Sequence, residues 1–372
     1  MAEIFLTIFF ISVLLFFLGT GIWVAISMIG VSAIGMILFT SRPVGDAMAT
    51  TIWGTSSSWT LTALPLFVWM GEILFRTKLS ENLFKGLSPW MQKLPGGLIH
   101  VNVVGCALFA AISGSSAATV ATVGKMSIPE LRKRNYPEKI LLGSLAGSGT
   151  LGLLIPPSII LIIYGVAVQE SIAKLFIAGI IPGIMIALIF MSYVVIWSLI
   201  NKKEMPQILE EYSFFEKIKR SKQLLPVILL ITSVIGSIYT GVATATEAAS
   251  LGVVGALILS YFQSSLTLET FKSSLLGATK TSCMIAFILA GSTFLSLAMG
   301  FTGLPRNLAV WIQNMNLSPY LLILVLMIFY IILGMFLDGI SAVVLTMAII
   351  EPMIRQAGFD MIWFGIFLVI VV

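Results

Sequence analysis

Three serines and a glycine stand together inside an apolar part of this chain. The segment AAISGSSAATVATVG, residues 110–124, contains Ser113, Gly114, Ser115 and Ser116. Small hydroxyl residues and glycine favour a sharp turn with accessible backbone groups over a continuous membrane helix. Hydroxyl and carbonyl oxygens are hard ligands for a small cation, whereas the N–H groups at the start of a helix favour an anion. The cluster therefore predicts a turn that binds ions.

A second segment, GSGTLGLLIPPS (Gly147–Ser158), places two prolines inside an apolar run. Proline has no amide donor, and it disfavours helical geometry in the residue before it. We expect the helix to unwind here and to free carbonyl oxygens that suit a monovalent cation. A packing motif of small residues with a proline kink is the alternative. The candidate ligands in this segment are Gly149, Thr150, Gly152, Ile155, Pro156 and Pro157.

A carboxylate occurs in a similar setting nearer the other end of the chain. The stretch LDGIS, residues 337–341, contains Asp338, Gly339 and Ser341 between apolar runs. An acidic residue within a membrane segment indicates a binding site. An aspartate before a helix is also typical of an N-terminal cap. The sequence gives both interpretations equal support.

The composition places these residues in a membrane. The 372 residues are 58% hydrophobic and 10% charged, and apolar stretches long enough to cross a bilayer recur along the chain. We predict an all-α polytopic membrane protein. The net charge of +5 reflects asymmetry between loops, and we expect no nucleic-acid partner.

Run length predicts both complete and interrupted membrane segments. The segments 97–131 and 318–354 are each split by polar residues into halves of about 15 residues, which is short for a span. Each split segment predicts a re-entrant hairpin, and two spans joined by a surface turn are the alternative. Complete spans are expected at about 3–19, 21–40, 60–76, 139–168 (the broken helix), 174–200, 224–242, 247–263 and 280–301.

The two halves of the chain resemble each other. TKLSENL (Thr77–Leu83) matches TGLPRNL (Thr302–Leu308) at four positions, and GSSA matches GISA at the same offset of 225. We predict a first repeat at 1–200, a cytoplasmic connector at 201–223 and a second repeat at 224–372. Five crossings between the hairpins would invert the second repeat, as in many secondary transporters.

Basic residues orient this topology. With the base of the first hairpin in the cytoplasm, 17 of the 21 Lys and Arg residues lie inside, as the positive-inside rule requires. The four outside would be Arg42, Lys174, Arg306 and Arg355.

The repeat also predicts that this chain is truncated at its C-terminus. Pro156 and Pro157 follow Pro129 by 27 and 28 residues. The same spacing from Pro352 places a second broken helix at about residue 379.

These motifs resemble the large membrane subunit of tripartite ATP-independent periplasmic (TRAP) transporters, of the DctM-like kind. The matching stretches are SGSSAATVATVG, IPEL with NYPEK, GTLGLLIPPS, YTGVATATEAASLG and GMFLDGISAVVLTMAIIEPM. The resemblance implies an elevator-type symporter that uses sodium to import an organic acid, such as a C4-dicarboxylate or sialic acid. One departure is Ala245, where family members usually have proline.

The resemblance further implies partners and a location. They are a small DctQ-like membrane subunit, a periplasmic substrate-binding protein, membrane lipids and the bacterial inner membrane. Sodium would be the one cofactor, bound with the substrate by the residues named above. Outward turns around 41–59, 241–247 and 303–316 would contribute to docking of the binding protein.

Two other functions are weaker. One is a stand-alone sodium/carboxylate transporter of the same superfamily. The other is an intramembrane enzyme, but Asp338 lacks a second aspartate at depth and His100 is not obviously near a serine. We expect no catalytic residue. His100 is interpreted as structural, Glu72 as a partner of Arg76 at helical spacing, and Glu247 as a cap.

Overall fold

A computed structural model describes residues 2–77, 79–206, 212–303, 307, 318–335 and 337–372. Within these ranges the regular structure is helical. The chain forms two compact units. One contains Met1–Thr62, Ile162–Leu175 and Thr281–Val372, and the other contains Ala63–Leu161 and Phe176–Lys280. The units do not coincide with the proposed repeats, which stay a prediction.

Several helices of the described part meet the length and hydropathy of a membrane span. Four do so individually: α11 (Ile172–Ile200), α14 (Ala245–Phe262), α15 (Leu268–Thr302) and α18 (Gly339–Gln356). Counting each bent helix pair as one span raises the number to as many as seven. The predicted all-α polytopic membrane protein is therefore confirmed.

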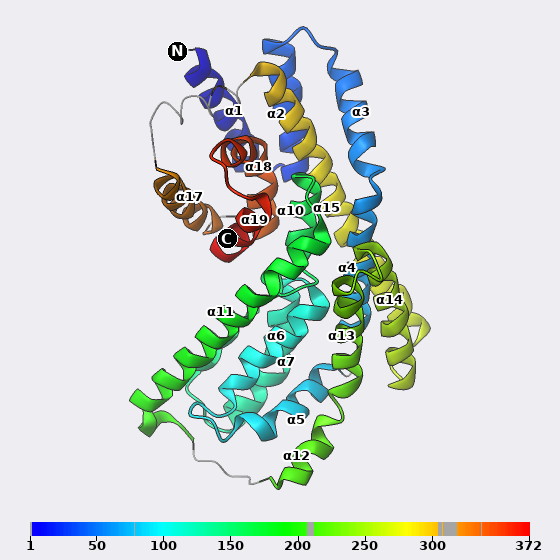
Figure 1. The fold of residues 1–372 in the computed structure, drawn as a ribbon, viewed down its shortest axis with the longest axis vertical. Coiled ribbons are helices and arrows are strands. Elements are labelled where there is room, and N and C mark those ends of the chain that lie inside the picture. The colour runs from blue at the N-terminus through cyan, green and yellow to red at the C-terminus, as the bar shows by residue number, and fades with distance from the viewer. Residues whose placement is uncertain (1, 78, 207–211, 304–306, 308–317, 336) are drawn as a thin grey trace. The chain divides into compact units, whose positions relative to one another are not determined.

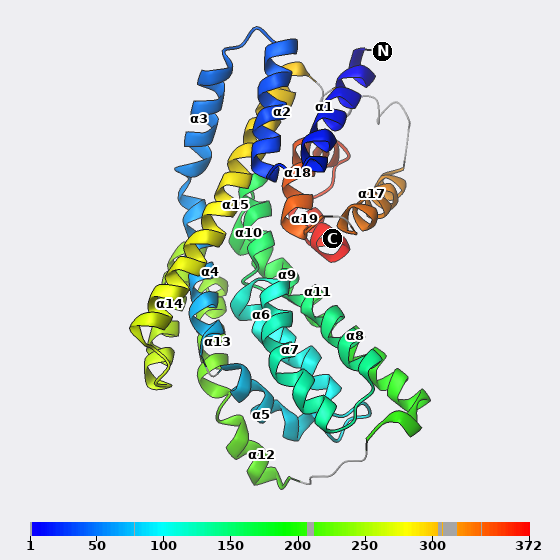
Figure 2. The ribbon, with the colours of Figure 1, turned by 180° about the vertical axis from the view of Figure 1, so that it is seen from behind.

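The first predicted hairpin forms the centre of the second unit. Helices α6 (Ile99–Ser113) and α7 (Ser116–Lys133) pack against each other, as Figure 1 shows. Both also pack against α8 (Glu138–Gly149), which is labelled in Figure 2. The short α9 (Leu151–Leu154) also packs on α6. An apolar cluster that includes Val103, Ala110 and Leu151 joins these helices to the part of α11 that lies in this unit.

Five more helices of this unit pack on this centre or on one another. The helix α5 (Leu79–Met91) packs on α6 and on α12 (Phe214–Ser221), as Figure 2 shows from behind. The helix α4 (Ala63–Phe75) packs along α14, which contacts α13 (Leu225–Tyr239). Short 3₁₀ turns, Trp59–Thr62 and Lys202–Glu204, precede α4 and follow α11.

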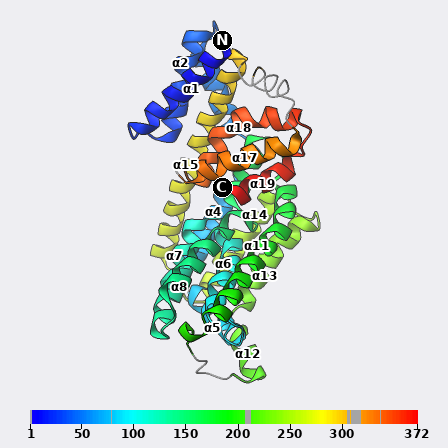
Figure 3. The same ribbon diagram turned by 90° about the vertical axis from the view of Figure 1, so that its left-hand side faces the viewer.

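The other unit gathers both ends of the chain. Helices α1 (Ala2–Gly19), α2 (Val24–Phe39) and α3 (Val44–Ser56) follow one another in sequence, and Met36 on α2 packs with Phe294 and Ala298 on α15. Helix α17 (Pro319–Gly334) contacts α18 and α19 (Met361–Val371), and the three lie together in Figure 3. The Tyr164 hydroxyl of α10 (Ile159–Ala167) donates to the Met361 carbonyl at 2.6 Å.

The predicted spans match the helices, with two corrections. The expected outward turn at 41–59 is mostly the helix α3, which begins after Pro43 and carries Asp46 in its first turn. A proline before a helix and an acidic residue in its first turn both indicate a helix start. The apolar pattern of this segment is weak, so run length alone did not predict the helix. The helix α15 begins at Leu268, well before residue 280, because the Thr267 hydroxyl caps it by accepting the Thr270 N–H at 3.1 Å.

Parts of three predictions lie outside the described residues. These are Arg306, most of the turn at 303–316, and residues 207–211 of the connector. The described remainder of the connector contains a 3₁₀ turn, Lys202–Glu204, and the helix α12.

Candidate functional site

The turn between α6 and α7 is built on one left-handed glycine. Helix α6 ends at Ser113, and Gly114 has φ +58° and ψ 12°. Glycine adopts this conformation without the steric penalty that a Cβ brings. Ser115 then caps α7, its hydroxyl accepting the Ala118 N–H at 3.5 Å. The predicted tip is thus a two-residue turn between two helices.

Hydrogen bonds from hydroxyl groups connect the residues on the two sides of this turn. The Ser113 and Thr119 hydroxyls lie 2.8 Å apart, and Thr119 donates to the Ser115 carbonyl at 2.7 Å. The Ser115 N–H points to the Ser113 hydroxyl at 3.4 Å. Both Ser113 and Thr119 are buried. Sequence reasoning missed Thr119, whose position four residues after the cap was the available signal.

The predicted break in the following helix is confirmed. Helix α9 ends at Leu154 and α10 begins at Ile159, with a cis peptide between Pro156 and Pro157. Because proline has no N–H, the carbonyls of Gly152 and Leu153 lose the donor four residues ahead. The Ser158 hydroxyl replaces that donor at the Leu153 carbonyl.

The tip and the break meet directly. The Ile159 N–H donates to the Gly114 carbonyl at 3.3 Å. A Cβ on Gly114 would lie 2.8 Å from the Pro157 oxygen, and one on Gly152 would lie 2.9 Å from the Ser115 oxygen. Backbone therefore faces backbone with no space for a side chain. The structure brings together the two segments that the sequence proposed as ligands.

The remaining candidates of this region surround that junction. Gly149 lets α8 approach Val120 of α7. The exposed Thr150 donates its hydroxyl to the Gly147 carbonyl at 2.7 Å. Ser116, the first residue of α7, and Ile155, the C-cap of α9, are half-buried. The junction thus combines backbone carbonyls, which suit a monovalent cation, with the N-terminus of α7, which suits an anion.

The second hairpin tip, between α17 and α18, has a different local structure. Asp338 is exposed and caps α18, its Oδ2 accepting the Ser341 N–H at 3.3 Å. Gly339 is the first residue of α18, and Ser341 is buried. The interpretation of Asp338 as a cap is confirmed, and its role in binding stays a prediction.

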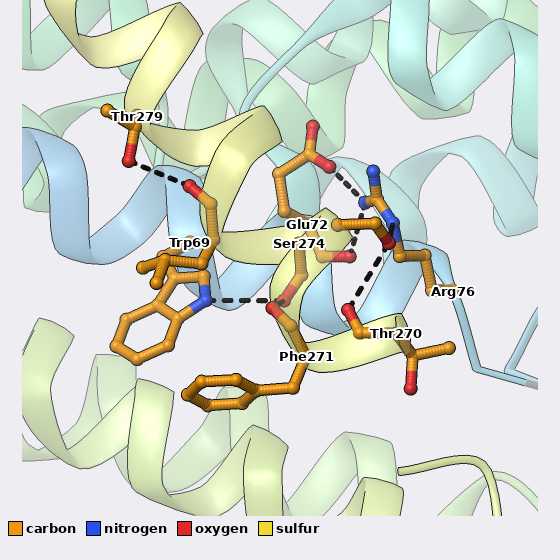
Figure 4. Close-up of polar contacts among 9 residues, drawn as sticks. Trp69, Glu72, Arg76, Thr270, Phe271, Ser274 and Thr279 are labelled. Atoms are coloured by element: carbon orange, nitrogen blue, oxygen red, sulfur yellow. Dashed lines mark hydrogen bonds and ion pairs between the residues drawn. The ribbon is translucent and has the colours of Figure 1, made fainter. Parts of the chain in front are cut away.

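An ion pair at the C-terminal end of α4 lies against the start of α15, as Figure 4 shows. Glu72 and Arg76 pair across one helical turn, as predicted, and the Arg76 Nε donates to the Ser273 hydroxyl at 2.9 Å. The Trp69 Nε1 donates to Ser274 at 3.3 Å. A Cβ on Gly277 would lie 2.6 Å from Glu72 Oε2, so α15 approaches the Glu72 carboxylate closely at this glycine. The hydrogen bonds from Arg76 and Trp69 connect the two helices within one unit.

The other polar residues of interest have structural roles. His100 is buried, and its Nε2 lies 2.8 Å from the Pro95 carbonyl. Glu247 and Thr244 form a capping box at the start of α14. In the described part of the chain, no three His, Cys, Asp or Glu side chains gather to hold a metal.

Comparison with known proteins identifies the family. The model of the tripartite ATP-independent periplasmic transporter, DctM component, matches residues 11–372. A C4-dicarboxylate TRAP transporter large permease protein of Pseudomonas aeruginosa is 33% identical over 343 residues, covering 92% of this chain and 80% of that protein. The sialic acid TRAP transporter large permease protein of Vibrio cholerae is 31% identical over 352 residues, with coverages of 94% and 81%.

A fused permease is also similar. The isethionate TRAP transporter permease protein DctMQ of Oleidesulfovibrio alaskensis is 30% identical over 358 residues, covering 95% of this chain and 55% of that protein. These relatives are transporter permeases, so the enzyme alternative loses its support. The chain belongs to the DctM family, the large permease component of tripartite ATP-independent periplasmic transporters.

Proposed function

We propose that this chain is the large transmembrane subunit of a sodium-coupled TRAP transporter in the bacterial inner membrane. It imports an organic acid, of the class that includes C4-dicarboxylates and sialic acid, delivered by a periplasmic substrate-binding protein. A small DctQ-like membrane subunit completes the complex. The names of similar permeases, which include C4-dicarboxylate and sialic acid transporters, support the substrate class.

The observation that supports ion coupling is the contact between the hairpin tip and the broken helix. The prolines leave the Gly152 carbonyl without its helical donor, in a region where Gly152 touches the backbone of Ser115. Such unwound carbonyls coordinate cations in discontinuous transporter helices. The second tip, with Asp338, Gly339 and Ser341, is proposed as part of a further sodium site. An elevator movement of the hairpins follows from the family resemblance and stays part of the proposal.

The test is to separate the tip from the break by one methyl group. In Gly152→Ala, the new Cβ would lie 2.9 Å from the Ser115 carbonyl carbon and oxygen, which are backbone atoms. Overpacking of this kind costs about 1–3 kcal/mol. The matched control is Gly143→Ala, because Gly143 lies on α8 of the same unit with no atom within 4 Å of its Cβ position. Alanine there favours the helix by about 1 kcal/mol.

The measurement is uptake of labelled organic acids by the reconstituted complex, with and without a sodium gradient. We expect Gly152→Ala to reduce sodium-dependent uptake by about fivefold to a hundredfold, as a loss of about 1–3 kcal/mol implies. We expect Gly143→Ala to transport normally. Normal sodium dependence in a folded Gly152→Ala complex would contradict the assignment of the junction. Uptake without the binding protein would instead support the stand-alone transporter.

A further inference from the structure

The helix α12 presents an apolar face to its surroundings. Phe214, Phe215 and Ile218 are 70%, 77% and 41% exposed, although they lie within one turn of each other on one side of the helix. Three large apolar side chains are costly to leave in water. This face therefore fits an apolar environment rather than bulk solvent.

Basic residues flank the apolar face. Helix α12 carries Lys217, Lys219 and Arg220, and Lys222 follows it. Glu216 is the one acidic residue of the helix, and its carboxylate accepts the Ser213 N–H at 2.9 Å in a capping box. Lys219 and Arg220 are exposed. The helix thus joins an apolar face to an excess of positive charge, a pattern typical of helices that lie in a membrane interface.

Contacts with α5 fix the orientation of this helix. The Trp90 Nε1 donates to the Ser221 hydroxyl at 2.7 Å, and the Trp90 ring meets Phe214 edge-on at 6.2 Å. The Lys217 ammonium lies 5.4 Å from the centre of the same ring. These contacts hold one side of α12, which leaves Phe215 directed away from α5.

The junction with α13 sets the angle of the helix. Helices α12 and α13 are bent by 58° at a short break. A Cβ on Gly86 of α5 would lie 2.6 Å from Leu224 Cγ, so α5 packs closely on this break. Because α13 has the exposed apolar surface of a membrane helix, including Leu229, the bend turns α12 away from the direction of a span. Trp90 at such a boundary is typical of interfacial anchors.

We propose that α12, together with Trp90, is a binding site for anionic phospholipids. The apolar face enters the acyl chains just below the headgroups, and the basic residues contact the phosphates. Each Lys or Arg near an anionic surface adds about 1 kcal/mol of attraction, roughly a fivefold preference. The excess of basic residues on α12 is the observation that favours an anionic phospholipid over a neutral one. The site is separate from the ion junction and does not depend on the proposed transport cycle.

The experiment places a fluorophore on the apolar face of the full chain in proteoliposomes. The label is attached at Phe215→Cys in a Cys283→Ala background, since Cys283 is exposed and Cys106 is buried. The vesicles contain phosphatidylcholine and phosphatidylglycerol, with either one brominated to quench the label. We expect brominated phosphatidylglycerol to quench several-fold more than its mole fraction predicts.

Charge variants separate recognition from simple insertion. Lys219→Gln with Arg220→Gln is expected to reduce that enrichment several-fold. The matched control, Lys202→Gln with Lys203→Gln, removes the same charge from the exposed 3₁₀ turn of the same connector. It is expected to leave the signal at residue 215 unchanged.

Three results would overturn the proposal. The first is no quenching by either lipid, and the second is quenching that follows mole fraction regardless of charge. The third is loss of quenching when the small membrane subunit is co-reconstituted, which would assign the face to a protein contact.

Discussion

The two hairpin tips share a short motif but satisfy their backbone groups in different ways. At the first tip, Gly114 takes a left-handed conformation and is enclosed by the backbone of Pro157 and Ile159. At the second tip, Asp338 is exposed and accepts one N–H of its own helix. The first tip is therefore held by tertiary contacts, whereas the contact at Asp338 is local. A change in the first tip should disturb a larger part of its unit.

The largest effect is expected for Gly114→Ala. The substitution places a Cβ 2.8 Å from the Pro157 oxygen and forces alanine into φ +58°. The left-handed conformation costs about 1–2 kcal/mol, and overpacking against backbone adds about 1–3 kcal/mol. We expect a marked fall in the melting temperature of the purified chain and loss of sodium-dependent uptake.

A glycine after the second hairpin provides the matched control. Gly358 has φ +81° and no atom within 4 Å of its Cβ position. Gly358→Ala should therefore show the conformational cost without the overpacking, and a clearly smaller loss of stability. Equal losses of stability in the two variants would mean that the backbone packed around Gly114 does not add to the cost of the substitution.

An intermediate effect is expected for Ser158→Ala. Ser158 is fully buried, and its hydroxyl donates to the Leu153 carbonyl, which has lost its helical donor to Pro157. An unsatisfied buried carbonyl costs about 1–3 kcal/mol. The melting temperature should fall accordingly.

The matched control for Ser158 is a serine on an unbroken helix. Ser192 of α11 donates its hydroxyl to the Leu188 carbonyl at 2.8 Å, and it is exposed. That carbonyl keeps its backbone donor in the helix, so Ser192→Ala should change stability little. A comparable loss in Ser192→Ala would refute the role given to the proline break.

Much of this contrast could be predicted from the sequence. Run length located the spans because a bilayer imposes a minimum of apolar residues. The cluster Ser113–Ser116 predicts a turn, and the two prolines predict a break in the helix. Both predictions hold because glycine, small hydroxyl residues and proline act on the local backbone. Glu72 and Arg76 were paired by helical spacing alone.

The rest depends on contacts that the sequence does not encode locally. Thr119 closes the tip only because the turn brings it to Ser113. Arg355 lies 3.7 Å from Glu170 and donates to the Val168 carbonyl, both distant in the chain. Gly152 was named as a ligand candidate, but its contact with Ser115 follows from how α9 packs on the tip. Packing partners, rather than residue types, decide these roles.

The smallest effects on stability are expected at the two helix caps, Asp338 and Ser115. These two variants compare the hairpin tips at equivalent positions. Asp338→Ala removes the bond to the Ser341 N–H and should cost about 1 kcal/mol. Ser115→Ala removes a longer bond, 3.5 Å to the Ala118 N–H, and should cost less than that. Both are measured as shifts in melting temperature in one detergent.

Asp338→Asn then separates the cap from the proposed ion site. An asparagine oxygen accepts the same N–H, so stability should stay close to that of the unchanged chain. The amide carries no charge, however, and is a weaker partner for a cation than a carboxylate. If Asp338 contributes to a sodium site, as proposed, this variant should lose sodium-dependent uptake in the reconstituted complex at unchanged melting temperature. Full uptake with a normal sodium requirement would leave Asp338 as a cap and restrict ion binding to the enclosed first tip.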